Sequence, residues 1–170
     1  DILANRHSEV DPRFLFVNAG YNFRPTEIQG AFGIHQLPRL DGFVDIRRDN
    51  ARYWNEKLGR FDDYLILPAE EPDTKHSSFA YGVTVKPDAP FSKDSLVTYL
   101  ESQGLETRPI EAGNIMAQPA MNQIPHRVHG SLTNSELIQR RSFFFGNGHH
   151  VGPEERMAVV KYFQDFIGRR

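Results

Sequence analysis

Apolar residues recur at helical spacing in several stretches of the chain and therefore predict helices. The first helix begins at Pro25, a residue favoured in a first helical turn, is interrupted at Pro38 and continues as an amphipathic segment to Leu58. Ser92 is a suitable N-cap for a later helix, and Gly104 follows the end of that helix. The predicted helices after the first span residues 93–103, 135–141 and 153–167.

Shorter apolar runs predict strands between these helices. Residues 79–85 alternate apolar with small or polar positions, which is typical of a half-buried strand. Residues 111–134 contain Gly, Pro, Asn and His without sustained periodicity, and a loop of this length in a compact domain is usually functional or mobile. The other predicted strands span residues 14–17, 65–67, 105–110 and 143–145.

The composition is that of a globular protein with a buried core. Hydrophobic residues make up 39% of the 170 residues and charged residues 25%, and 13 Phe, 6 Tyr and one Trp supply large apolar side chains. A net charge of -2 provides no general basic field for a phosphate backbone, so we expect no nucleic-acid partner. The chain has no cysteine and no apolar stretch near the roughly 20 residues of a membrane helix, so we expect a cytoplasmic protein that does not bind membranes.

Two segments contain polar residues suited to binding an anion. Asn22 and Arg24 lie in a turn before the first helix, whose exposed amides carry a partial positive charge, and a phosphate would suit this site. Arg108 ends a predicted strand and precedes a turn with Gly113 and Asn114, an arrangement suited to a diphosphate or to sugar hydroxyls. Both segments have simpler interpretations: an ordinary turn and helix start for the first, and a surface ion pair of Arg108 with a neighbouring glutamate for the second.

The histidines and glycines do not predict a metal or dinucleotide site. His149 and His150 are adjacent and do not converge on one face, and no carboxylate stands at a metal-binding spacing from His126 or His129. The turn at residues 146–152 has one residue too many for a dinucleotide-binding GxGxxG sequence and does not open a dinucleotide fold. We therefore expect no bound metal and no nicotinamide cofactor.

The run from Gly20 to Leu37, GYNFRPTEIQGAFGIHQL, is similar to the long-helix signature of the DegT/DnrJ/EryC1/StrS aminotransferase family. The resemblance implies a cofactor, pyridoxal 5'-phosphate (PLP) or pyridoxamine 5'-phosphate (PMP), and a homodimer. In that dimer Asn22 reaches the cofactor phosphate of the other subunit, with Arg24 beside it. Residues 77–82 resemble the family's Ser-Ser-Trp-Phe-Gly-Phe strand near the active site, with Phe79 in place of the tryptophan, although alternating aromatic residues are also typical of a core strand.

The sequence RPIEAGN, from Arg108 to Asn114, resembles the family's sugar 3-dehydratase branch, which includes GDP-4-keto-6-deoxymannose 3-dehydratase and CDP-4-keto-6-deoxyglucose 3-dehydrase. This resemblance implies that Arg108, Gly113, Asn114 and Phe79 contact the nucleotide-sugar substrate. It also implies removal of the 3-hydroxyl from a nucleotide-linked 4-keto-6-deoxy sugar, in deoxysugar or aminosugar biosynthesis such as that of lipopolysaccharide O-antigen. The alternatives are transamination at C4 of the sugar and a non-catalytic truncated domain that only dimerises.

The resemblance further implies the fold and the division of the chain. We expect an α+β fold, the small C-terminal domain of a fold-type-I PLP-dependent transferase, with a mainly antiparallel sheet covered by helices and a long lead-in helix. Residues 1–60 are expected to form the interdomain and dimer-interface segment with that helix, and residues 61–170 the small domain. The large PLP-binding domain and the catalytic Lys or His are expected upstream of Asp1, so this fragment has no catalytic residue of its own and is expected to be inactive alone.

Overall fold

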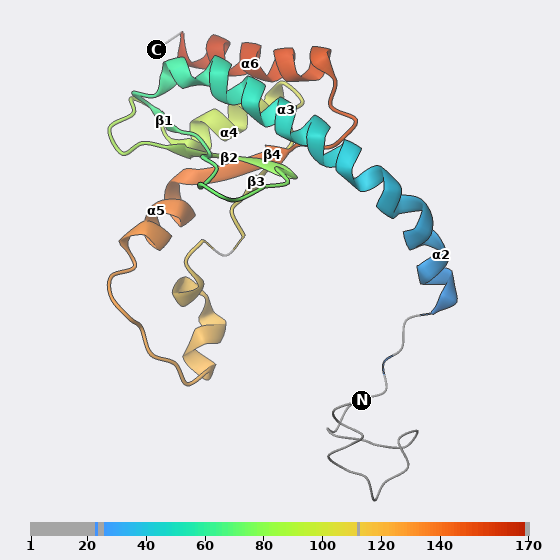
Figure 1. Ribbon diagram of the computed structural model, residues 1–170. Coiled ribbons are helices and arrows are strands. Elements are labelled where there is room, and N and C mark those ends of the chain that lie inside the picture. Colours follow the sequence, from blue (N-terminus) through green and yellow to red (C-terminus); the bar gives the residue numbers. More distant parts are fainter. Residues whose placement is uncertain (1–22, 24–25, 112, 169–170) are drawn as a thin grey trace, which may run out of the picture. The chain divides into compact units, whose positions relative to one another are not determined.

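The computed structural model describes residues 23, 26–111 and 113–168 (Figure 1). The chain divides into two compact units, residues 1–38 and 39–170. In the first unit, helix α2 spans Glu27–Gln36, and at its start Gln29 Oε1 accepts the amide proton of Thr26 at 2.9 Å. The interruption predicted at Pro38 is present as a 3₁₀ turn over Leu37–Arg39. The strand predicted at residues 14–17 lies outside the described residues.

The second unit contains a four-stranded sheet in the order β1-β2-β4-β3, in which every neighbouring pair is antiparallel. Strand β2 pairs with β4 from Ala80–Gly146 to Thr84–Ser142, and β3 pairs with the opposite side of β4. The antiparallel sheet expected from the sequence is therefore confirmed. Its strands are β1 (Leu65–Ile66), β2 (Ala80–Val85), β3 (Thr107–Pro109) and β4 (Ser142–Gly146).

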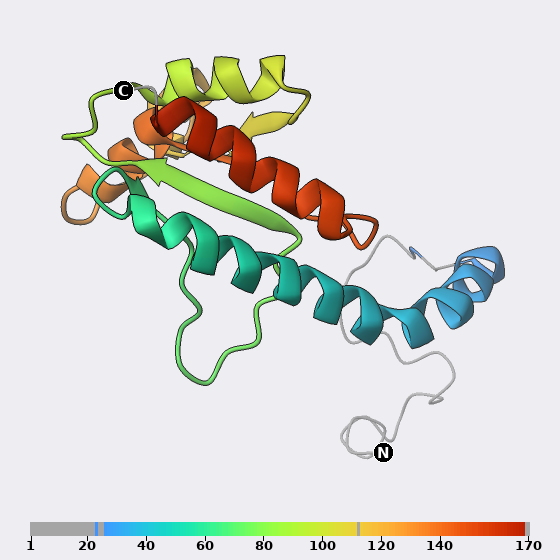
Figure 2. The same ribbon diagram turned by 90° about the horizontal axis from the view of Figure 1, so that it is seen from above.

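Three helices cover one face of this sheet (Figures 1 and 2). They are α3 (Leu40–Leu58), α4 (Lys93–Ser102) and α6 (Pro153–Ile167). Helix α5 (Thr133–Arg141) lies against the other face, where Ile138 lines a small pocket together with Ile66 and Thr84. The covering by helices agrees with the expected α+β fold.

Trp54 of α3 lies at the centre of the core between sheet and helices. Its ring packs edge-on against Tyr81 of β2 and Phe145 of β4, with ring centroids 5.1 and 5.0 Å away. The indole N–H donates a hydrogen bond to the Arg156 carbonyl oxygen of α6 at 3.1 Å, so the buried polar atom is satisfied. Because α3 is part of this core, it belongs to the compact unit 39–170, and the division of function near residue 60 stays a prediction.

The local signals for α4 are confirmed. The Ser92 side chain accepts the amide proton of Ser95 at 3.1 Å, which satisfies one of the free amides at the helix start. Gly104 follows the helix with a φ of 89°, a left-handed conformation that glycine adopts without a steric penalty. The long loop after β3 contains two 3₁₀ segments that the sequence pattern did not predict, Ile115–Ala117 and Pro119–Gln123.

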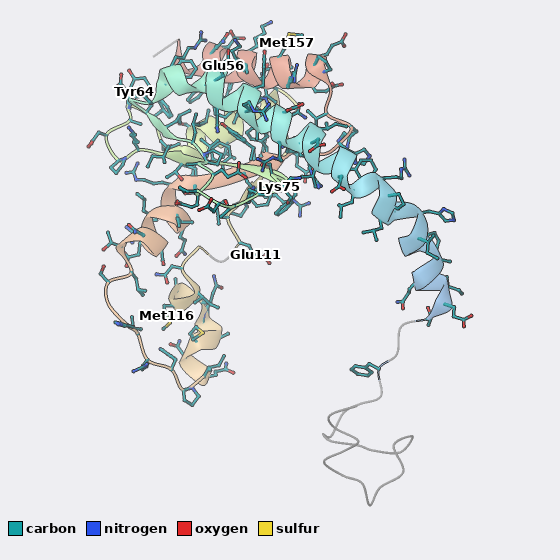
Figure 3. The ribbon with its side chains drawn as sticks, viewed as in Figure 1. Glu56, Tyr64, Lys75, Glu111, Met116 and Met157 are labelled. Carbon is teal, nitrogen blue, oxygen red and sulfur yellow. The ribbon has the colours of Figure 1, made fainter. Side chains whose placement is uncertain are left out.

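Truncation of Phe163, which is fully buried on α6 beside Phe145, should lower the free energy of unfolding strongly. Phe163→Ala removes a large ring from the core and leaves a cavity, so we expect a loss of about 3–5 kcal/mol. Met157 projects from the same helix with 52% of its surface exposed, and Met157→Ala is the matched control, with an expected change within about 0.5 kcal/mol (Figure 3). Chemical denaturation followed by Trp54 fluorescence measures both variants. Equal losses would contradict the assignment of the inner face of α6.

Candidate functional site

Strand β3 brings Arg108 to the rim of a cavity of about 540 Å³ at the edge of the sheet. This volume lies within the range of small-molecule sites, and the cavity combines an apolar wall with a few polar groups, as such sites do. The wall includes Trp54, Phe145, Val151 and Val159, and the polar side chains are those of Glu106, Arg108, His150, Glu155 and Tyr162.

Arg108 forms an ion pair with Glu106 at the surface, as the simpler interpretation of this segment predicts. Its Nε and Nη2 atoms donate to Glu106 Oε1 at 3.4 and 3.1 Å, and both side chains are exposed. An exposed pair of this kind contributes little to stability. A phosphate or carboxylate ligand can therefore replace Glu106 at low cost, and a guanidinium group binds such ligands with two parallel hydrogen bonds.

Gly113 and Asn114 do not line this cavity and instead shape the start of the long loop, where Gly113 lies against α5. Gly113 has a φ of 46°, and a Cβ atom at this position would lie 2.6 Å from the Cα of Gln139, so only glycine fits. Asn114 is buried, and its Oδ1 accepts the amide proton of Met116 at 3.1 Å. These are structural roles, and the substrate role of both residues stays a prediction.

Phe79 directly precedes β2 and is 66% exposed, whereas Tyr81 is the aromatic residue of this strand that enters the core. The Phe79 carbonyl oxygen accepts the amide proton of Asn147, the residue that follows β4, at 3.1 Å. Strand β4 therefore has Phe79 on its β2 side and Arg108, which pairs with Phe144, on its β3 side. The structure thus places these two predicted residues on opposite sides of the same strand, β4.

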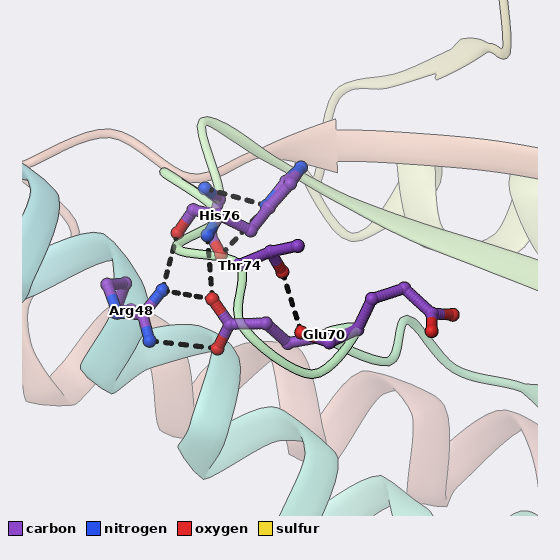
Figure 4. A network of polar contacts seen from close by, with 6 residues as sticks. Arg48, Glu70, Thr74 and His76 are labelled. Atoms are coloured by element: carbon purple, nitrogen blue, oxygen red, sulfur yellow. Dashed lines mark hydrogen bonds and ion pairs between the residues drawn. The ribbon is translucent and has the colours of Figure 1, made fainter.

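The 67–79 loop, which leads to Phe79, is attached to α3 by an ion pair that sequence reasoning missed (Figure 4). Arg48 Nη1 and Nη2 donate to the two Glu70 carboxylate oxygens at 2.5 and 2.8 Å, and Nη1 also donates to the His76 carbonyl oxygen at 2.8 Å. The His76 amide donates to Glu70 Oε1 at 2.6 Å. The hydrogen bond from Arg48, followed by that from the His76 amide, lowers the pKa of the Glu70 carboxyl to about 2.

Asn147 provides a second attachment that the sequence did not reveal. Its side chain is buried, and Nδ2 donates to the carbonyl oxygens of Arg47 on α3 and Ser78 in the 67–79 loop, both at 2.8 Å. Its Oδ1 accepts a hydrogen bond from Asn50 Nδ2 at 3.3 Å. The sequence interpretation treated residues 146–152 as a glycine- and histidine-containing turn, and nothing in that pattern marks Asn147 as a link between three segments.

The described residues do not by themselves form a site for covalently held PLP. A lysine that carries the cofactor needs a pocket that lowers its pKa. The hydrogen bond with Glu56 instead raises the pKa of Lys57, and Lys93 pairs with Asp94 at 3.4 Å. Asn22 and Arg24, the predicted phosphate contacts, lie outside the described residues. All five lysines of the chain are exposed or half-buried: Lys57, Lys75, Lys86, Lys93 and Lys161.

No metal site is present among residues 23, 26–111 and 113–168, where no three His, Asp or Glu side chains are placed to share an ion. His149 instead stacks on the Phe43 ring, with ring centroids 4.0 Å apart. Within the same residues, no helix has the length and apolar character needed to cross a membrane.

The sequence matches the model of the DegT/DnrJ/EryC1/StrS aminotransferase family over residues 3–164. The chain belongs to this family. It is 32% identical to the dTDP-4-dehydro-2,6-dideoxy-D-glucose 3-dehydratase of Saccharopolyspora spinosa over 94% of its own length and 34% of that protein. It is 34% identical to the GDP-4-keto-6-deoxy-D-mannose 3-dehydratase of Escherichia coli O55:H7 over 82% of its length and 35% of that protein. The chain therefore spans about a third of the length of these relatives.

The fold of the family is also recognisable in solved structures. The structure of E. coli GDP-4-keto-6-deoxy-D-mannose-3-dehydratase with bound hydrated PLP matches 91% of this chain with a TM-score of 0.77 and 32% identity, and the chain covers 38% of that structure. The chain thus has the fold of one part of a fold-type-I PLP-dependent transferase. The resemblance of the chain to the 3-dehydratase branch is supported by both relatives and by this structure.

The Arg48–Glu70 pair should make stability depend on pH in the acid range. Because the pKa of Glu70 in the folded state is about 2, below the ordinary value of 4.5, its contribution is present above the ordinary value and is lost as the pH falls towards the folded-state pKa. The difference in free energy of unfolding between the wild type and Glu70→Gln should therefore be constant from neutral pH to about pH 5 and then shrink towards zero. Denaturant titrations across this range measure the difference.

Glu71→Gln is the matched control, because it removes the same charge from the next position of the same loop. It should leave the acid dependence of stability close to that of the wild type. A Glu70→Gln difference that stays the same down to about pH 2 would contradict the ion pair.

Proposed function

We propose that this chain forms part of a PLP- or PMP-dependent enzyme that removes the 3-hydroxyl group from a nucleotide-linked 4-keto-6-deoxy sugar. The observation that carries the proposal is the identity of at least 30% to two 3-dehydratases over most of the chain. The RPIEAGN sequence, which begins at Arg108 beside the 540 Å³ cavity, supports the same reaction class.

In this proposal Arg108 binds the diphosphate of the nucleotide sugar, because its partner Glu106 is exposed and easily replaced. Phe79 contacts the sugar with its exposed ring, and Gly113 and Asn114 hold the loop that completes the substrate side. When bound, the cofactor would supply an electron sink for loss of the 3-hydroxyl and, as PMP converted to PLP with release of ammonia, the two electrons that the deoxygenated product has gained.

Asn22 and Arg24 are proposed to bind the cofactor phosphate of a second subunit in a homodimer. The apolar residues of α2 support an interface at this segment, because Ile28, Phe32 and Ile34 are all exposed within the described chain. Residues 1–60 would then form the interdomain and dimer-interface segment, and residues 61–170 the small domain. The enzyme would act in the cytoplasm.

We further propose that the chain alone is inactive, and that the group that holds PLP or moves the proton at the cofactor belongs to the large PLP-binding domain. Two observations support this division: the chain spans about a third of its relatives, and its five lysines are exposed or half-buried.

Product analysis tests the reaction. The holoenzyme that carries this chain is incubated with PMP and with GDP- or dTDP-linked 4-keto-6-deoxy sugar, and the product is identified by mass spectrometry and NMR. We expect a sugar that keeps its C4 ketone and has lost the oxygen at C3, and no turnover by the chain alone. A 4-amino sugar that keeps its 3-hydroxyl would show that the reaction is transamination and not dehydration. Turnover by the 170-residue chain would contradict the proposal that the large domain supplies the catalytic group.

Substitution of Arg108 tests its role at the diphosphate. Arg108→Ala should raise KM for the nucleotide sugar roughly tenfold or more, because a hydrogen bond to a charged group contributes about 1.5–3 kcal/mol. Arg108→Lys should recover part of this loss, since lysine keeps the charge without the paired N–H groups. Glu106→Gln is the matched control: it breaks the same ion pair, keeps the cation and should leave KM within about twofold of the wild type. Similar KM values for all three variants would remove Arg108 from the site.

A further inference from the structure

The backbone just before Phe79 adopts a conformation that its residue type disfavours. Ser78 has a φ of 50°, in the left-handed region, which few non-glycine residues occupy. Such residues persist only where their surroundings fix them, and they concentrate at functional sites.

Hydrogen bonds fix the backbone on both sides of this residue. The Ser78 amide donates to His76 Nδ1 at 3.0 Å, and the Ser78 carbonyl oxygen accepts from Asn147 Nδ2 at 2.8 Å. The carbonyl oxygen of the next residue, Phe79, accepts from the backbone amide of Asn147 at 3.1 Å. Asn147 thus binds two successive carbonyl groups, one with its side chain and one with its backbone.

Asn147 itself has a fixed position. It is 1% exposed, its Nδ2 also donates to the Arg47 carbonyl oxygen of α3, and its Oδ1 accepts from Asn50. Its carboxamide therefore connects the end of β4, helix α3 and the 67–79 loop. Since Phe79 remains 66% exposed, its ring adds little to the core that these bonds brace.

We infer that Asn147 is a positioning residue for substrate: through the carbonyl groups of Ser78 and Phe79 it holds the Phe79 ring in the direction in which it meets the nucleotide sugar. The inference rests on the proposed function, in which Phe79 contacts that sugar. If Asn147 only stabilised the fold, it would make the same hydrogen bonds, but the orientation of the exposed Phe79 ring would not affect substrate affinity.

Two substitutions break this arrangement from opposite sides. Asn147→Ser removes the carboxamide that reaches Arg47 and Ser78. Ser78→Val leaves Asn147 intact but places a β-branched residue where the backbone is left-handed, which forces the loop out of this conformation. Thr84→Val is the matched control, because it removes the 2.7 Å hydrogen bond to Ser142 at the other end of the same strand pair.

Steady-state kinetics of the holoenzyme with PMP and with GDP- or dTDP-linked 4-keto-6-deoxy sugar test the inference. Asn147→Ser and Ser78→Val should each raise KM about tenfold and leave kcat within about threefold, since they weaken binding of substrate and transition state alike. The double variant should raise KM no further than the single ones, because both act through the same backbone segment. Thr84→Val should lower the melting temperature and leave KM unchanged.

Hydrogen exchange of the 170-residue chain gives a second readout that does not depend on the reaction. In Asn147→Ser the amide of residue 147, which donates to Phe79, should exchange at least tenfold faster than in the wild type. Faster exchange with an unchanged KM would overturn the inference and leave the proposed function intact. An unchanged KM in Phe79→Ala would instead remove Phe79 from the substrate site and the inference with it.

Discussion

The burial of Trp54 between the sheet and its helices is the contact on which the rest of the unit 39–170 depends. Its ring touches aromatic residues of β2 and β4, and its N–H binds the backbone of α6, so a single side chain joins two strands and two helices. This contact also fixes the rotation of α3 about its axis. The inward face of α3 carries residues four apart, namely Asn50, Trp54 and Leu58. The adjacent face therefore lies towards the 67–79 loop. This face and the loop line a cavity of about 220 Å³, to which the helix contributes Arg48, Ala51, Arg52 and Asn55.

The 67–79 loop takes its conformation from this outward face of α3. The loop contains no helix or strand, but two residues of α3 hold it. Arg48 binds Glu70 and the His76 carbonyl group. Asn55 Nδ2 donates to the Pro68 carbonyl oxygen at 3.1 Å. The hydroxyl group of Tyr81 donates in turn to Asn55 Oδ1 at 2.7 Å, so the core and the loop share one hydrogen-bond network. Hydrogen bonds and an ion pair, rather than apolar packing, therefore connect the residues before Phe79 to the core.

The elements could be predicted from the sequence because their signals are local. Helical spacing, the Ser92 cap and the alternation in β2 each act within a few residues, and the observed α6 has the predicted bounds of 153–167. The attachments could not be predicted in this way. Arg48 and Glu70 are 22 residues apart, and Asn147 lies 100 residues from Arg47, so neither contact leaves a periodic trace in the sequence.

The same limit applied to the candidate site. Arg108, Gly113 and Asn114 are close in sequence, and only the fold separates an arginine at the cavity from a glycine packed against α5 and an asparagine that binds the Met116 amide within the loop. Alternation predicted two faces for residues 79–85, but β2 begins at Ala80, and Phe79 before it is 66% exposed and follows the left-handed Ser78. The Ser78 backbone is held both by His76, two residues away, and by Asn147, 69 residues away, and the second partner leaves no signal in the local sequence.

This way of holding the site separates stability from specificity. The side chains that build the core face the helices, whereas Phe79 and Arg108 are exposed and are placed through backbone hydrogen bonds and strand pairing. A backbone bond does not depend on the side chain of the residue that makes it, so a change at position 79 or 108 would alter what the proposed site contacts and leave the core intact.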